Sequence, residues 1–340
     1  CRARGQPVNA LETMADLRVR LEARRAGHKL KAIRQQYGET LIALAKEHPD
    51  LMVVTADLMY ATGMGEFGAK FPERLINLGI AEQNMTGVAA GLASSGRPVI
   101  VDGYAAFTTL RALEQAKVDS AYNGVKLILT GQSAGLSYGV GGPTHQTYED
   151  VAIMRAIPNT VVVVPADARQ VDACLHAALA YETSGPIYVR LGRGPEYLLG
   201  RDDAFAIGHG QVLREGADLA IVANGPMVFE AMLAADLLAE EGIAGRLINL
   251  HTVKPLDTEL LLETARKVPA MLVVEEHSVL GGLGGAVAEA LSEVSHGPIR
   301  RLGIPDAFPP IGPTFELRDA LGLSAVHIVR HARELLENRR

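Results

Sequence analysis

The chain has 340 residues, 48% of them apolar, and a formal net charge of −6 with acidic and basic residues well mixed. This length and apolar content suffice for one large or two medium cores and suggest two domains. The mixed charge argues against nucleic acid or an anionic membrane as a partner. The only cysteines, Cys1 and Cys174, are too few for a disulfide framework and lack metal-ligand spacing. No apolar run reaches the roughly 18 residues of a membrane span, and residues 1–30 lack the layout of a signal peptide. We therefore expect a cytoplasmic protein.

The first half of the chain predicts a parallel sheet. A polar tail (residues 1–10) precedes a helical pattern over residues 11–46, which we expect to form two helices broken near Gly27. Helical stretches then alternate with continuous apolar runs, at residues 51–56, 99–101, 125–129, 161–164 and 187–191. Continuous rather than alternating apolar runs are typical of strands buried on both faces. The βα order predicts a mostly parallel sheet covered by helices.

A second βα series follows a Gly- and charge-rich linker. Strands are expected at residues 219–223, 245–250 and 270–275, and helices at 228–241, 256–267 and 286–294. We therefore predict an α/β protein with two doubly wound domains. The expected divisions are a tail and helix at 1–29, a first domain at 30–195, a linker at 196–208 and a smaller second domain at 209–340.

The Gly-rich turn at residues 281–285 could suggest a phosphate-binding loop, because such loops often open a helix. Its spacing does not fit, since Val287 stands where the third glycine would be. We predict a tight strand-to-helix turn. His251 and His277 lack a partner constellation, and we interpret both as structural.

The most informative stretch is residues 77–85, Asn-Leu-Gly-Ile-Ala-Glu-Gln-Asn-Met. It follows a short strand-like segment and runs into a helix of small residues, which places Glu82 near a helix N-terminus. Taken alone, this position also suits a glutamate that merely complements the helix dipole. The segment Gly-Ile-Ala-Glu-Gln-Asn-Met, however, resembles the pyrimidine-domain signature of thiamine-diphosphate enzymes of the transketolase family. In that family the glutamate hydrogen-bonds N1′ of the aminopyrimidine and promotes loss of the C2 proton, so the resemblance implies a catalytic, cofactor-binding role for Glu82.

Further motifs in the same order strengthen the resemblance. Asp57 follows the first strand, where transketolases carry Ala-Asp-Leu. Phe107 matches the aromatic residue that stacks on the aminopyrimidine, and residues 111–115, Arg-Ala-Leu-Glu-Gln, resemble the following helix of split transketolases. His145 lies in a Thr-His-Gln segment, where it would face substrate hydroxyls and move protons. Alone, Phe107 would suit a core and His145 a loop, but the motif order favours a site.

One family motif is missing. Transketolases bind the cofactor's diphosphate and Mg²⁺ through a Gly-Asp-Gly motif in a preceding domain, and this sequence contains no Gly-Asp-Gly. The resemblance therefore implies the C-terminal subunit of a split transketolase. An N-terminal transketolase subunit would hold the diphosphate and Mg²⁺. We expect self-association of this chain within a heterotetramer.

The substrate positions match only in part. Arg34 and Arg190 resemble family positions that grip a substrate's phosphate, and Ser133 stands where many members have His. Ala61 replaces a phosphate-contacting Ser, and Gly141 replaces an Asp that reads hydroxyl stereochemistry, which is expected to open space there. The expected reaction is transfer of a two-carbon ketol unit from a ketose with a phosphate or sulfonate tail, outside the standard pentose phosphates. Apulose phosphate and sulfofructose are candidates by resemblance to other split enzymes.

Three alternatives remain at this point. The beta subunit of a 2-oxoacid dehydrogenase shares the glutamate motif and the split, but usually lacks the Thr-His-Gln segment. A 1-deoxyxylulose-5-phosphate synthase-like activity would use the same segment. A catalytically silent homologue would not need to retain Glu82, Phe107 and His145 together.

Overall fold

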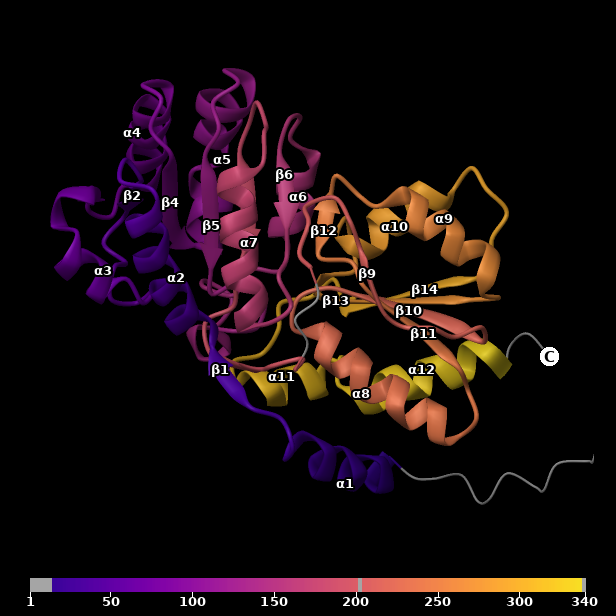
Figure 1. The fold of residues 1–340 in the computed structure, drawn as a ribbon. Coiled ribbons are helices and arrows are strands. Elements are labelled where there is room, and N and C mark those ends of the chain that lie inside the picture. Colours follow the sequence, from indigo (N-terminus) through magenta and orange to yellow (C-terminus); the bar gives the residue numbers. More distant parts are fainter. Residues whose placement is uncertain (1–13, 201–203, 338–340) are drawn as a thin grey trace, which may run out of the picture.

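The computed structural model describes residues 14–200 and 204–337, which form two α/β domains side by side (Figure 1). The first is built on a seven-stranded sheet in the order β12-β6-β7-β5-β4-β2-β3, parallel except for β12. Its strands are β2 (Met52–Thr55), β3 (Leu75–Asn77), β4 (Val99–Tyr104), β5 (Ile128–Gln132), β6 (Val161–Val163), β7 (Ile187–Arg190) and β12 (Thr252–Lys254). Its helices are α2 (Ile33–Glu47), α3 (Gly65–Lys70), α4 (Glu82–Ser94), α5 (Leu113–Gln115), α6 (Asp150–Ala156) and α7 (Ala168–Ala180), with the short segments η1 (Pro72–Arg74), η2 (Phe107–Arg111), η3 (Ala116–Tyr122) and η4 (Gly139–Gly141).

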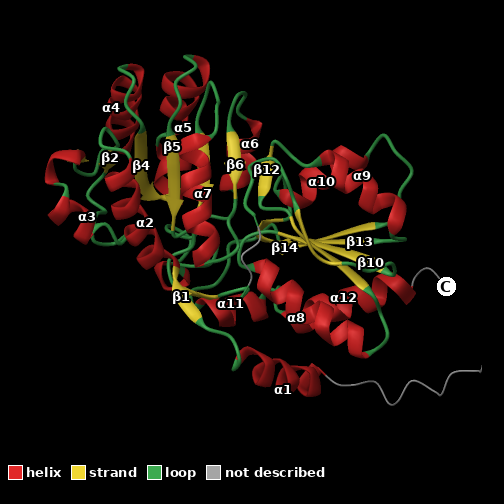
Figure 2. Cartoon of the chain, viewed as in Figure 1, coloured by secondary structure: helices red, strands yellow, loops and turns green. Residues whose placement is uncertain are grey.

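The second domain is built on a five-stranded sheet in the order β14-β13-β10-β11-β9, parallel except for β9. Its strands are β9 (Gln211–Arg214), β10 (Leu219–Ala223), β11 (Gly245–Asn249), β13 (Met271–Ser278) and β14 (Ile299–Ile304). Its helices are α8 (Met227–Glu240), α9 (Thr258–Lys267), α10 (Leu283–Leu291), α11 (Thr314–Ala320) and α12 (Ala325–Glu337). A two-stranded ribbon of β1 (Leu30–Ala32) and β8 (Pro195–Tyr197) completes the fold (Figure 2).

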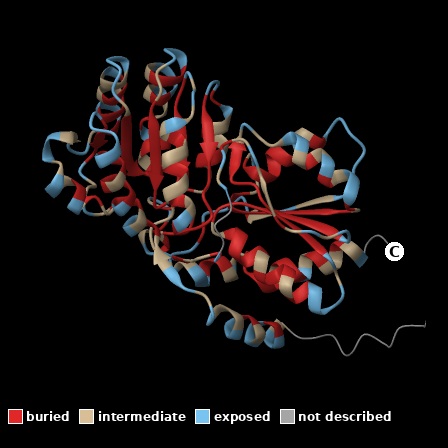
Figure 3. Cartoon of the chain, in the orientation of Figure 1, coloured by how far each residue is buried: buried red, intermediate tan, exposed pale blue. Residues whose placement is uncertain are grey.

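Consecutive residues of each central strand enter different cores, because side chains alternate across a sheet. Val53 of β2 and Ile100 of β4 belong to one core, which α2 and α7 cover. Val54 and Val101 belong to another, which α4 and α6 cover. Figure 3 shows both sheets buried between helices whose outer faces are exposed. This two-sided burial explains the continuous apolar runs of the sequence.

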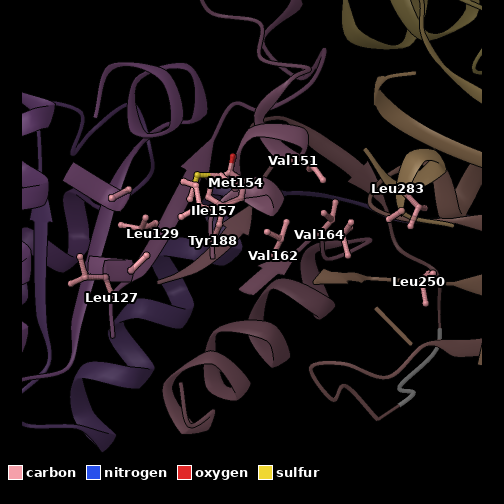
Figure 4. Close-up of a cluster of buried hydrophobic side chains, with 14 of the residues drawn as sticks. Leu127, Leu129, Val151, Met154, Ile157, Val162, Val164, Tyr188, Leu250 and Leu283 are labelled. Carbon is pink, nitrogen blue, oxygen red and sulfur yellow. The ribbon is translucent and has the colours of Figure 1, made fainter. Parts of the chain in front are cut away.

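The two domains share one core rather than meeting at a loose boundary. Leu127 and Val162 of the first sheet belong to the same buried cluster as Leu250 and Leu283 of the second half (Figure 4). Strand β12, which follows β11 in the chain, leaves the second domain and pairs with β6 of the first sheet. The edge of the first sheet is thereby completed by the second half of the chain.

Helix α1 (Met14–Arg25) precedes the first domain but packs against the second (Figure 1). Leu17 and Leu21 are buried in the core beside α8 and α12. Arg25 pairs with the buried carboxylate of Glu230 on α8 at 2.6 Å. The helix therefore fastens the start of the chain to the domain that ends it.

The predicted fold class is confirmed, and the strands expected at residues 51–56, 161–164 and 219–223 correspond to β2, β6 and β10. The break expected near Gly27 lies between α1 and α2. The predicted tail at residues 1–10 lies outside the described residues. Strands β1, β8, β9, β12 and β14 were not predicted, because none of them is a continuous apolar run. Among the described residues, no helix is both long and apolar enough to cross a membrane.

The Gly-rich turn at residues 281–285 is a strand-to-helix turn, as predicted. The carboxylate of Glu275 accepts hydrogen bonds from the backbone amides of Leu283 (2.6 Å) and Gly284 (2.8 Å) at the start of α10. These amides are the groups that would otherwise bind a phosphate. An internal carboxylate thus satisfies this helix terminus.

Candidate active site

The candidate site lies at the carboxyl edge of the first sheet, where parallel strands of an α/β fold bring their following residues together. Asp57 follows β2, Tyr104 ends β4, Ser133 follows β5 and Arg193 lies three residues beyond β7. Glu82 opens α4, shortly after β3. Five separate strands therefore contribute to one edge.

Glu82 is buried, with 2% of its surface exposed, although it is the first residue of its helix. Its carboxylate oxygens accept hydrogen bonds from Nη1 of Arg111, at 2.9 and 2.8 Å. The side chain of Arg111 is 48% exposed. The buried carboxylate is thus compensated by a cation that lies largely in solvent.

Phe107 and Arg111 come from η2, a single π-helical turn that directly follows β4. The amide of Ala112 donates to the carbonyl of Phe107 at 3.2 Å, five residues back. A π turn holds more residues than an α turn, and such turns are frequent at functional sites. Here it places the guanidinium of Arg111 4.4 Å from the centre of the Phe107 ring, in cation–π geometry.

His145 lies among aromatic rings next to this pair. Its ring centre is 5.6 Å from that of Phe107, 6.2 Å from that of Tyr104 and 5.6 Å from that of Tyr138, each in edge-to-face geometry. Nδ1 contacts the hydroxyl of Thr144 at 2.9 Å. Nε2 is therefore the nitrogen that can face a bound molecule. The structure brings Glu82, Phe107 and His145 together through this chain of contacts.

The far side of the aromatic group is cationic. The guanidinium of Arg193 lies 4.0 Å from the centre of the Tyr138 ring and donates to the Tyr104 hydroxyl at 2.8 Å. Arg34 adjoins it, because the Arg34 amide donates to the Arg193 carbonyl at 3.3 Å. The Arg34 side chain is exposed and that of Arg193 is half-buried. Arg193 thus marks the cationic end of the site, and Arg34 adjoins it through its backbone.

The sequence motifs indicated Arg190, and not Arg193, as a residue that binds the substrate's phosphate. The Arg190 guanidinium is buried and pairs with Asp150 at 2.8 Å. It also donates to the carbonyls of Thr147 (3.2 Å) and Glu276 (2.9 Å), the latter in the second domain. The structure therefore places Arg190 in the domain boundary and Arg193 in the site. A cation flanked by glycines just past a strand end was the sequence signal that could have singled out Arg193.

Asp57 and Ser133 share an unusual backbone conformation. Their φ values are 62° and 59°, in the left-handed region that non-glycine residues rarely adopt. Asn77 accepts from the Asp57 amide at 3.0 Å, which helps to hold that turn. The Ser133 hydroxyl is buried without a hydrogen-bond partner. Backbone strain of this kind concentrates at functional sites, where the surrounding fold maintains it.

The open space expected beside Gly141 is absent, and that prediction is wrong. A β-carbon at Gly141 would lie 3.0 Å from Cβ of His145 and 3.0 Å from the Tyr138 ring. The glycine allows both side chains to approach the backbone more closely than any other residue would. Its effect is therefore to position Tyr138 and His145, rather than to enlarge the site.

Models of two domain families match the chain: the transketolase pyrimidine-binding domain over residues 29–195 and the transketolase C-terminal domain over residues 208–328. The chain belongs to the transketolase family. The 6-deoxy-6-sulfo-D-fructose transketolase subunit of Clostridium sp. (strain MSTE9) is 40% identical over 308 residues, covering 90% of this chain and 95% of that subunit. An apulose-4-phosphate transketolase subunit of Phocaeicola vulgatus is 37% identical, with 90% of this chain and 98% of that subunit covered.

Among solved structures, a split gene transketolase described as an inactive beta4 tetramer superposes with a TM-score of 0.82 at 40% identity. The match covers 91% of this chain and 99% of that one. Transketolase-family 1-deoxy-D-xylulose-5-phosphate synthases also match, but this chain spans only 47% of one such enzyme, that of Heliobacterium modesticaldum. The relatives from Clostridium and Phocaeicola, of which this chain covers 95% and 98%, are thus separate transketolase subunits.

Proposed function

We propose that this chain is the C-terminal subunit of a two-subunit, thiamine-diphosphate-dependent transketolase. It would transfer a two-carbon ketol unit from a ketose with an anionic tail to an aldose. The observation that carries the proposal is a series of contacts that runs from Glu82 through Arg111, Phe107, His145 and Tyr138 to Arg193. A carboxylate, an aromatic face, an imidazole and a cation follow one another at the sheet edge.

The residues present fit the pyrimidine end of thiamine diphosphate. An aminopyrimidine needs an aromatic face for stacking and a carboxylate for its ring nitrogen, and Phe107 and Glu82 offer both within one patch. The carboxylate is buried, yet its partner Arg111 is 48% exposed and therefore displaceable. When bound, thiamine diphosphate supplies a carbon nucleophile for ketose carbonyls. Glu82 would hold and return a proton at the ring nitrogen.

His145 is suited to handling the substrate. With Nδ1 engaged by Thr144, Nε2 can exchange a proton with a sugar hydroxyl near the reacting carbon. The surrounding rings of Phe107, Tyr104 and Tyr138 fix the orientation of the imidazole.

Arg193 and Arg34 are suited to bind the anionic tail. A guanidinium presents paired donors that match a phosphate or sulfonate. The names of the relatives from Clostridium and Phocaeicola specify a sulfonated and a phosphorylated sugar, respectively. We therefore propose a sugar with an anionic tail as the substrate, and assays with phosphorylated and sulfonated sugars should distinguish the two kinds of tail.

The diphosphate and its Mg²⁺ are assigned to a partner subunit. In residues 14–200 and 204–337, no cluster of three or more His, Cys, Asp or Glu residues could hold a metal ion. The side chains of Ile80 (77% exposed) and Tyr122 (83%) leave apolar surface near the elements that carry Glu82 and Arg111. A similar solved chain is described as a beta4 tetramer, which supports association of copies of this chain within the proposed heterotetramer.

Subunit mixing tests the proposal. The isolated chain should lack ketol-transferase activity and bind thiamine diphosphate weakly, and addition of the N-terminal partner with Mg²⁺ should restore both. Tight Mg²⁺-dependent binding by this chain alone would contradict the two-subunit assignment. Ketose phosphates or sulfonates should be donors, whereas turnover of pyruvate or branched 2-oxoacids would favour a deoxyxylulose-phosphate synthase or 2-oxoacid dehydrogenase activity instead.

A further inference from the structure

Arg111 makes both contacts that the proposed cofactor would need. Its guanidinium lies over the Phe107 ring at 4.4 Å and donates to both carboxylate oxygens of Glu82. A guanidinium and an aminopyrimidine are both flat, and both can stack on a ring while donating to a carboxylate. We propose that Arg111 is a placeholder for the aminopyrimidine, which occupies the Phe107–Glu82 patch and leaves when thiamine diphosphate binds. This inference rests on the proposed function.

The placeholder role explains how the carboxylate of Glu82 can be buried in the absence of cofactor. Glu82 is buried to 2% exposure, and a buried carboxylate without a partner is strongly destabilising. Arg111 neutralises it while the site contains no cofactor. Once an aminopyrimidine nitrogen has taken over that role, the arginine is no longer required.

The surroundings of Arg111 allow it to move away. Its side chain is 48% exposed, so the guanidinium can turn into solvent without losing a buried environment. It is the last residue of the π-helical turn η2, and Leu110 beside it is also exposed (45%). Glu82, which would stay in place, is fixed differently, since it and the neighbouring Met85 of α4 are buried.

The consequence is competition between Arg111 and the cofactor. Binding of the aminopyrimidine requires the charge-assisted contact between Arg111 and both carboxylate oxygens of Glu82 to break, which weakens the observed affinity for the cofactor. Because Arg111 is half exposed, solvent screens that contact. We therefore expect its removal to tighten cofactor binding by about threefold to thirtyfold, less than for a fully buried pair.

The test is the dissociation constant of thiamine diphosphate, measured by calorimetry with Mg²⁺ on the assembled two-subunit enzyme. Arg111→Met keeps an apolar side chain over Phe107 but lacks the charge, and it should lower the dissociation constant. Arg111→Lys keeps the charge but not the flat guanidinium that lies over Phe107, and it should give an intermediate value. The matched control is Arg74→Met, because Arg74 also stacks on a ring, that of Phe71 at 5.0 Å, outside the site. The control should leave the dissociation constant unchanged.

Thermal unfolding provides a second readout. Arg111→Met should lower the midpoint of the cofactor-free protein, because Glu82 loses its partner, and this deficit should disappear at saturating thiamine diphosphate. An unchanged or raised dissociation constant in Arg111→Met, with a deficit that persists in the loaded protein, would show that Arg111 stays in place and would overturn the inference alone. If neither wild type nor variant bound thiamine diphosphate, the proposed function itself would fail.

Discussion

The backbone amide of Arg34 donates a hydrogen bond to the carbonyl of Arg193 at 3.3 Å, which joins the start of α2 to the segment beyond β7. The bond joins the helix that precedes β2 to the segment that follows β7. It brings together, at the cationic end of the site, the backbones of two arginines that are far apart in sequence. The guanidinium of Arg193 at this end contacts Tyr104 and Tyr138.

Arg193→Ala should selectively impair the use of sugars with an anionic tail. A charge-assisted contact contributes about 1.5–3 kcal/mol, so KM for a phosphorylated or sulfonated sugar should rise by roughly tenfold to a hundredfold. An uncharged acceptor such as glycolaldehyde should be used almost as well as by wild type. The measurement is KM for both substrates in the assembled enzyme. Equal losses on the two would mean that Arg193 supports the fold of the site instead of binding the tail.

Arg190→Ala is the companion variant, three residues away. It removes the partner of Asp150, which is fully buried, and the link to the carbonyl of Glu276. Breaking a buried pair typically costs about 3–5 kcal/mol, so we expect a clear fall in the thermal midpoint of the protein. Folded Arg190→Ala protein should show no preference between charged and uncharged acceptors beyond that of wild type. A selective KM effect without loss of stability would return Arg190 to the role that its sequence position suggested.

Glu82→Gln should preserve the size of the side chain and its capacity to hydrogen-bond, but not proton exchange. Proton transfer by a positioned side chain is typically worth about 10²- to 10⁴-fold in rate. We expect kcat to fall within that range, with no rescue by excess thiamine diphosphate. The measurement is steady-state turnover of the assembled enzyme at saturating cofactor. A variant that kept more than about half of the wild-type rate would make Glu82 a helix-opening residue only.

The sequence predicted the elements of the site that depend on a specific motif. Glu82, Phe107 and His145 each lie in a stretch of several matching residues, and the structure brings these three together. The interior strands of both sheets were predictable because burial on both faces demands continuous apolar runs. Their order in the chain then indicated a parallel sheet.

The contacts that could not be predicted are those made between distant segments. Arg190 ends the strand at residues 187–190 and Arg193 lies three residues later, and the partner that buries Arg190 is Asp150 on a distant segment, α6. The pairing of Arg111 with Glu82 likewise depends on the π-helical turn after β4. Sequence periodicity carries no information about such a turn, because it inserts an irregular step into a helix.

The domain boundary also depends on a buried cluster of charges that the sequence did not indicate. Arg318 on α11 donates to both carboxylate oxygens of Glu196 at 2.7 and 2.8 Å, and it also pairs with Glu276 on β13. Arg318→Met should lower the thermal midpoint, because two buried carboxylates lose their shared cation. Adding Glu196→Gln and Glu276→Gln to that variant should recover part of the loss. No recovery in the triple variant would show that packing, and not charge, is the contribution of Arg318.

The carboxylate of Asp102, on β4, is fully buried beneath the site. Burial raises its pKa from 3.8 to about 6, although hydrogen bonds from groups such as Thr62 and Tyr37 oppose the rise. The folded protein therefore binds a proton more readily than the unfolded chain between these values. It follows that the contribution of Asp102 to stability falls as pH rises from about 4 to about 6 and then remains reduced at higher pH.

Asp102→Asn should remove this contribution, because its amide stays neutral throughout. The full shift corresponds to about 3 kcal/mol, and most of it is lost between pH 4 and pH 7, so over this range the variant should lose roughly 2–3 kcal/mol less stability than wild type. The measurement is urea unfolding at both pH values, with the exposed Asp50→Asn as a matched control that should behave as wild type. An identical pH dependence in wild type and Asp102→Asn would mean that the pKa of Asp102 in the folded protein equals its ordinary value, with its hydrogen-bond donors offsetting the effect of burial.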